Sequence, residues 1–94
     1  MNESKVKSYY GFALKSNNLV VGVDNILKKK CSLIVLSKAL AQNSKNKCYA
    51  KYGSSTKIVE IENDELCRIT DNSKILAFGV IEKNLSNALL DNLN

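Results

Sequence analysis

The sequence predicts an α/β fold: a three-layer α/β/α sandwich around a mixed sheet of four strands, in one domain over residues 1–94. The length of 94 residues, with 45% apolar and 24% charged side chains, suits one small folded domain. Continuous apolar runs at 33–36 and 75–81 are typical of strands buried on both faces. Helical periodicity separates the strands, so crossover helices should cover both faces of the sheet.

The first third of the chain predicts two helices around a short strand. Asn17 and Asn18 end the first helix, over residues 5–16, because asparagine tolerates turn geometry. Residues 19–21 form a strand that stops at Gly22, and a second helix runs from 23 to about 30. The side chains expected to face inward from the two helices are Val6, Tyr10, Ala13, Leu14, Val23, Ile26 and Leu27.

The middle of the chain predicts a strand at 33–36, a loop over 37–43 and a helix that Ser44 caps and Gly53 ends. A β-branched strand follows at 57–61, and Asn63 caps a short helix through residue 68. Beyond a turn at 71–73, residues 75–81 form the second buried strand. The last helix is amphipathic through Leu85, Ala88, Leu89 and Leu93.

Composition argues against an enzyme. The chain has no histidine, which removes the commonest general base and metal ligand. Cys31, Cys48 and Cys67 are widely spaced and form no C-x-x-C pair, so we expect reduced, mostly buried thiols rather than zinc ligands or disulfides. The sequence predicts no catalytic residue, metal or cofactor. It also predicts no secretory signal and no membrane segment, and hence a cytoplasmic protein.

The net charge of +5 is unevenly distributed. Residues 1–57 carry eleven lysines against two acids, and residues 58–94 carry seven acids against three basic residues. A basic half is typical of a protein that binds a polyanion, because lysines displace the counterions of phosphates. A merely solvated surface is the alternative. Lys45, Lys47 and Lys51 could extend a nucleic-acid footprint, whereas we expect Glu60, Glu62, Asp64 and Glu65 to be solvated or to favour a helix start.

The most informative segment spans residues 18–28. A strand runs into Gly22, where the backbone can be approached closely, and a helix starts directly after it. Asp24 and Asn25 fall in the first turn, and Lys28 lies one turn after Asp24 on the same face. This arrangement predicts a platform for phosphates and purine edges. The structural alternative is that Asp24 or Asn25 merely caps the helix or neutralises its N-terminus.

This segment, Asn18-Leu19-Val20-Val21-Gly22-Val23-Asp24-Asn25-Ile26-Leu27-Lys28, resembles the entry to the second helix of the ribosomal proteins L-seven-Ae and L-thirty-e. Four further stretches resemble the same family in the same order, so the likeness covers nearly the whole chain. They are Tyr10-Gly11-Phe12-Ala13-Leu14-Lys15, similar to the bacterial branch, then the runs at 31–39, 43–47 and 65–69.

The resemblance implies an RNA-binding protein of the translation apparatus, associated with the ribosome or another structured RNA. Many family members bind the kink-turn, a sharply bent RNA with tandem G·A pairs, through the start of the second helix. The family's Gly-x-Asn-Glu is replaced here by Gly22-Val23-Asp24-Asn25, and its second contact loop corresponds to the polar stretch 70–74. The RNA-binding residues that it implies are Gly22, Val23, Asp24, Asn25, Lys28, Lys29 and Lys74.

Two alternatives come from other function classes. A protein–protein adaptor on the same scaffold would account for the acidic second half of the chain, since a fold does not fix a function. A small hydrolase or transferase is disfavoured by the missing histidine and by the absence of a glycine-rich phosphate loop. Tyr9, Tyr10 and Phe12 could stack on bases, but their helical context favours packing.

Overall fold

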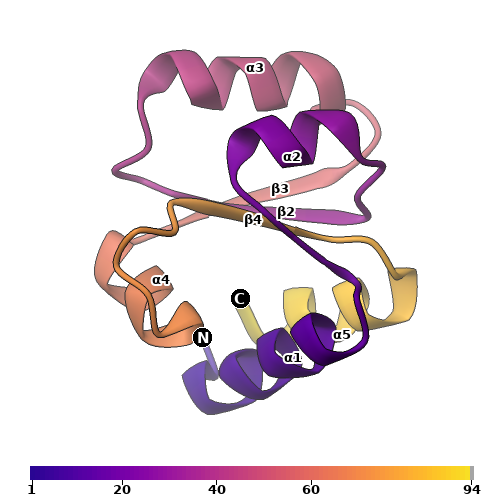
Figure 1. Cartoon of the computed structure of the whole chain (residues 1–94), viewed down its shortest axis with the longest axis vertical. Helices are drawn as coiled ribbons and strands as arrows, with labels where there is room; N and C mark the ends of the chain where they lie inside the picture. Colours follow the sequence, from indigo (N-terminus) through magenta and orange to yellow (C-terminus); the bar gives the residue numbers. More distant parts are fainter. Residues whose placement is uncertain (94) are drawn as a thin grey trace.

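Helices and strands alternate along the computed structural model, which describes residues 1–93 (Figure 1). Each helix after α1 follows the strand before it with only a short connection, so the chain crosses repeatedly over the sheet. The elements are α1 (Glu3–Lys15), β1 (Leu19–Val21), α2 (Val23–Lys28), β2 (Leu33–Ser37), α3 (Gln42–Tyr52), β3 (Lys57–Ile61), α4 (Asn63–Thr70), β4 (Ala77–Val80) and α5 (Lys83–Leu93).

The strands form one mixed sheet in the order β1-β4-β2-β3. β4 pairs antiparallel with both neighbours, and β2 pairs parallel with β3. Figure 1 shows α2 and α3 above one face of this sheet, and α1, α4 and α5 below the other. The predicted three-layer sandwich with a mixed four-stranded sheet is therefore confirmed.

The side chains of β2 alternate between the two faces of the sheet and contribute to a hydrophobic core on each face. Leu33 and Val35 belong to the core under α1, α4 and α5, and Ile34 and Leu36 belong to the core under α2 and α3. Successive side chains of a strand point to opposite faces, so a continuous apolar run can serve two layers at once. None of the helices within residues 1–93 combines the length and the apolar character that a bilayer span needs.

Two predicted helix caps are wrong. Helix α3 begins at Gln42 rather than at Ser44, and the Lys45 amide already donates to the Ala41 carbonyl (3.1 Å), so the first turn closes before Ser44 can cap it. Asn63 is not the cap of α4, because its Oδ1 accepts a hydrogen bond from the buried Ser37 hydroxyl (2.9 Å).

Glu62 precedes α4 instead, and the Glu65 carboxylate accepts from the Glu62 backbone N–H (3.3 Å). This is one half of a capping box, in which the third helical residue reaches back to the cap.

Two apolar side chains of α1 are not in the core. Leu14, expected to face inward, is 59% exposed, and Phe12, expected to pack, is 64% exposed. Val6, Tyr10 and Ala13 are buried as predicted, so the buried stripe of α1 is narrower than the sequence pattern indicates.

Two elements are shorter than predicted. Strand β4 covers Ala77–Val80 rather than 75–81, because the Ile75 and Ile81 amides donate to loop carbonyls of Asn72 and Asn18. Helix α2 ends at Lys28, since Lys29 is extended (φ −114°, ψ 156°). The Tyr52 hydroxyl donates to the Ile26 carbonyl (2.7 Å) and contacts that of Lys29, which fixes this end.

Candidate nucleic-acid interface

The turn into α2 is built around Gly22. Its backbone has φ 90° and ψ 148°, a conformation that side-chain-bearing residues rarely adopt. The Gly22 amide donates to the Ala77 carbonyl (3.0 Å), and its carbonyl accepts from the Ile26 amide (3.0 Å). A Cβ added at this position would meet no atom within 4 Å. The glycine is therefore required by the backbone conformation, and the space beside it is open to an incoming ligand.

The polar side chains of the first turn are exposed and do not cap the helix. Asn25 folds back instead, and its amide nitrogen donates to the Val21 carbonyl (2.8 Å), which braces the turn. Its side-chain oxygen remains able to accept. Asp24 makes no side-chain hydrogen bond or ion pair with any other of residues 1–93, while Val23 is half-buried. Neither side chain caps α2, so that part of the structural alternative is wrong, whereas the acidic Asp24 does lie in the first turn, where it favours the helix dipole.

The predicted basic residues do not all lie at this end of the sheet. Lys28 is exposed in the last turn of α2, one turn from Asp24, and exposed Lys29 follows the helix. Lys74 is exposed in the loop between α4 and β4, and its amide donates to the Asn72 side chain (2.9 Å). That loop enters β4 where α2 begins, so Lys74 belongs to the Gly22 end, whereas Lys28 and Lys29 lie toward the other end (Figure 1).

Ion pairs from the ends of β2 and β3 lie at the same end of the sheet as Gly22. The Lys38 ammonium is 2.9 Å from the Glu62 carboxylate, and this hydrogen bond raises the pKa of Lys38. Sequence reasoning missed this pair. The signal was the pairing of two parallel strands, which brings together the residues that follow each strand.

Glu60 is held by two partners, so the expectation that it is solvated is wrong. The Lys45 ammonium lies 3.0 Å from its carboxylate, and the Tyr49 hydroxyl donates to it (2.8 Å). These hydrogen bonds, the one from Lys45 above all, lower the pKa of Glu60. Lys45 also donates to the Lys38 carbonyl (2.9 Å). Its ammonium is therefore committed within the protein and extends no RNA footprint.

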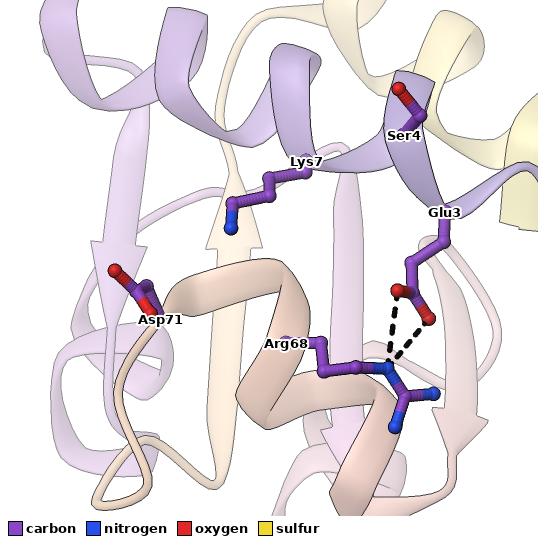
Figure 2. A pocket seen from close by; sticks show the side chains of 5 residues that line it. All are labelled: Glu3, Ser4, Lys7, Arg68 and Asp71. Atoms are coloured by element: carbon purple, nitrogen blue, oxygen red, sulfur yellow. Dashed lines mark hydrogen bonds and ion pairs between the residues drawn. The ribbon is translucent and has the colours of Figure 1, made fainter.

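A separate polar hollow lies between α1 and α4 (Figure 2). The Arg68 Nε donates to both carboxylate oxygens of Glu3, at 3.0 and 3.1 Å. Figure 2 shows the Lys7 side chain extending between the two helices, with Asp71 at the end of α4. Two acids thus balance two basic groups, and the hollow has no excess charge to attract a polyanion.

Among residues 1–93, no three cysteine, aspartate or glutamate side chains are placed to hold a metal ion.

Comparison with known proteins yields a fold and no family. No protein-family profile matches the chain. No curated protein matches it either. The chain is similar in structure to a protein with unknown function from Bacillus halodurans C, with a TM-score of 0.82 and 22% sequence identity, over 95% of this chain and 96% of that chain. At this identity the likeness shows that the two chains share their fold.

Proposed function

We propose that this chain is a non-enzymatic RNA-binding protein of the translation apparatus that binds structured RNA, such as a kink-turn, through the start of α2. The observation that carries the proposal is the open backbone at Gly22: within residues 1–93, an added Cβ would meet no atom closer than 4 Å outside Gly22 and its two chain neighbours. Asp24 is exposed in the first turn of α2 beside it, and Lys28 is exposed one turn further along the same face of the helix. Support also comes from the sequence resemblance, which spans nearly the whole chain.

A bent RNA suits such a surface. A regular A-form helix presents a deep, narrow major groove that side chains cannot enter, so a rigid helix start needs a bulge or kink to reach base edges. Asp24 has only acceptor oxygens and would accept from a guanine N–H. Lys28, Lys29 and Lys74 would contact phosphates, which makes affinity dependent on salt.

The test is a titration of a bulged RNA with tandem G·A pairs against a plain duplex of equal length, at about 50 and 200 mM salt. We expect tighter binding to the bulged RNA and a steep fall of both affinities with salt. Lys28→Glu should weaken binding to the bulged RNA by at least about tenfold. Lys5→Glu, an exposed lysine of α1, is the matched control and should weaken it far less.

Equal affinity for the two RNAs would leave only non-specific binding. Equal effects of Lys28→Glu and Lys5→Glu would show that the start of α2 is not the binding site.

A protein–protein adaptor is the second candidate function. Exposed Phe12 lines an apolar hollow between α1 and α5 together with Tyr9 and Leu85, and Leu14 is exposed on the same helix. Binding to neither RNA at low salt would favour this candidate.

A further inference from the structure

A large groove lies at the opposite end of the sheet from Gly22. It has a volume of about 770 Å³, and its walls come from the segments after α2, at the end of α3 and at the start of α5. These segments meet at the right of Figure 1, where β2 begins and β4 ends. We call it the lysine groove, after Lys30, Lys51 and Lys83 in its walls.

The charge of the lysine groove is of one sign. Of the residues described, 1–93, no aspartate or glutamate is among those that line it. The ion pairs within residues 1–93 join Lys38 to Glu62, Lys45 to Glu60 and Arg68 to Glu3, and so use none of the three lysines of the groove. Like charges around one hollow repel one another, and a concave surface lined by one sign of charge concentrates ions of the other sign.

Helix stability does not account for Lys83. It is the first residue of α5, and a cation there opposes the helix dipole, which favours anions at the amino end. Lys30 lies two residues beyond the end of α2 and is exposed. Neither side chain makes a hydrogen bond with another of residues 1–93. The positions of Lys30 and Lys83 are explained if their ammonium groups bind a ligand.

Lys51 is oriented by the protein itself. Its ammonium donates to the Leu27 carbonyl and lies 5.4 Å from the centroid of the Tyr52 ring. An ammonium has three N–H donors, so two remain for a ligand. The lysine is thus held in the wall of the groove before any ligand arrives, which lowers the entropy lost on binding.

Neutral polar groups complete the walls. The Ser32 hydroxyl donates to the Ile81 carbonyl (2.8 Å) and the Thr56 hydroxyl to the Cys31 carbonyl (3.2 Å), and these bonds tie the strand ends together. Ser55 and Asn87 line the groove as well, and their side chains make no hydrogen bond within residues 1–93. They supply neutral donors beside the three cations.

We propose that the lysine groove binds a run of linked phosphate groups. Three ammonium groups on separate walls suit several charges spread over one ligand better than a single small anion. The volume falls within the range of about 300–1,000 Å³ that is usual for ligand sites. Linked phosphates occur in free oligophosphates and in nucleic-acid backbones, and the experiment separates these two sources. The proposal is independent of RNA binding at Gly22.

The test uses the full chain and two probes at low salt: inorganic tripolyphosphate and a single-stranded oligouridylate of eight nucleotides. The double variant Lys30→Gln/Lys83→Gln removes two charges from the groove. Lys5→Gln/Lys15→Gln removes two exposed charges of α1 and is the matched control. We expect the groove variant to weaken binding of at least one probe by about tenfold, and the control to change it by less than about twofold.

Loss of affinity for tripolyphosphate alone identifies a free oligophosphate as the ligand. Loss for oligouridylate, with a salt slope reduced by about 1.4, identifies a nucleic-acid backbone. Equal effects of the two variants overturn the proposal, as does wild-type binding of both probes weaker than about 1 mM. Since neither Lys30 nor Lys83 bonds to another of residues 1–93, thermal unfolding should confirm that both variants stay folded. If the lysine groove binds neither probe, the proposed RNA binding at Gly22 is still decided separately, by the bulged-RNA titration with Lys28→Glu.

Discussion

The rings of Tyr10 and Phe78 pack edge to face, with the ring centroids 5.0 Å apart and the ring planes at 75°. This contact joins α1, at the beginning of the chain, to β4, one of the two inner strands of the sheet. Phe78 is fully buried and Tyr10 nearly so, and burial raises the pKa of Tyr10. The pair therefore links the first helix to the last strand within one core.

The Tyr10–Phe78 contact should be measurable as a coupling energy. Tyr10→Leu and Phe78→Leu should each lower the free energy of unfolding by roughly 1–3 kcal/mol. Edge-to-face pairs contribute about 0.5–1.5 kcal/mol beyond the buried area, so the double variant should lose less than the sum of the single losses by about that amount. Urea unfolding of the four proteins gives this value. Strict additivity would show that the rings contribute through burial alone.

Gly79 leaves room for the buried thiol of Cys31. A Cβ added at Gly79 would lie 2.7 Å from the Cys31 Sγ, well inside the contact distance. Gly79→Ala should therefore lower the free energy of unfolding by about 1–3 kcal/mol, the usual range for overpacking a core. The Cys31→Ala background removes the clashing sulfur, and there the same substitution should have a much smaller effect. An equal loss in both backgrounds would place the strain elsewhere.

The Lys45–Glu60 pair should make stability depend on pH in the acid range. The side chains of Lys45 and Glu60 are only 12% and 30% exposed, and the pKa of Glu60 is lowered from its model-compound value of 4.5. The unfolded state therefore takes up the proton first. The stabilisation is complete above pH 4.5 and is lost as the pH falls through the lower pKa of the folded state.

Glu60→Gln should remove that part of the pH dependence and lower the free energy of unfolding at pH 7 by roughly 1 kcal/mol. The measurement is urea unfolding of wild type and variant between pH 7 and pH 3. Glu62→Gln is the control, because the Lys38–Glu62 pair is much more exposed. If wild type and Glu60→Gln lost stability in parallel on acidification, the shift of the Glu60 pKa would be disproved.

The three thiols should react at different rates in the folded protein. Cys31 and Cys48 are buried, and burial raises the pKa of both, which reduces the thiolate that reacts. Cys67 is half-buried in α4. Iodoacetamide at pH 8, followed by peptide mass spectrometry, should modify Cys67 first, and all three should react alike in urea. Early modification of Cys31 or Cys48 would show that the hydrophobic core around that cysteine opens in the native state.

The elements that were predicted correctly are those specified by local apolar pattern. The run at 33–36 indicates a strand buried on both faces, and β2 supplies Leu33 to one core and Ile34 to the other. The start of α2 at Gly22 was also predicted, because a strand, a glycine and a helix follow one another directly in the sequence. Exposure of Asp24 and Lys28 follows from the same local geometry.

The errors concern contacts between segments far apart in the chain. Asn63 has the chemistry of a helix cap, yet Ser37, 26 residues away, occupies its side chain. The residues next to Glu60 in the sequence indicate a solvated side chain. Glu60 is paired with Lys45 because α3 packs over β3. The lysine groove likewise joins Lys30 to Lys83 across the sheet, and no spacing along the sequence reveals their proximity.

The place of β4 between β1 and β2 constrains the order in which the chain can fold during its synthesis. Among the strands of residues 1–93, β1 has no neighbour other than β4, so it stays unpaired until residues 77–80 have been made. Before then only the parallel pair of β2 and β3 is available, and the apolar side chains of β2 lack the Phe78 strand beside them. Parallel pairing alone forms slowly and leaves an unpaired strand edge. A nascent chain that ends before residue 77 therefore leaves both β1 and one edge of β2 without a partner, and the sheet can close only when β4 joins them.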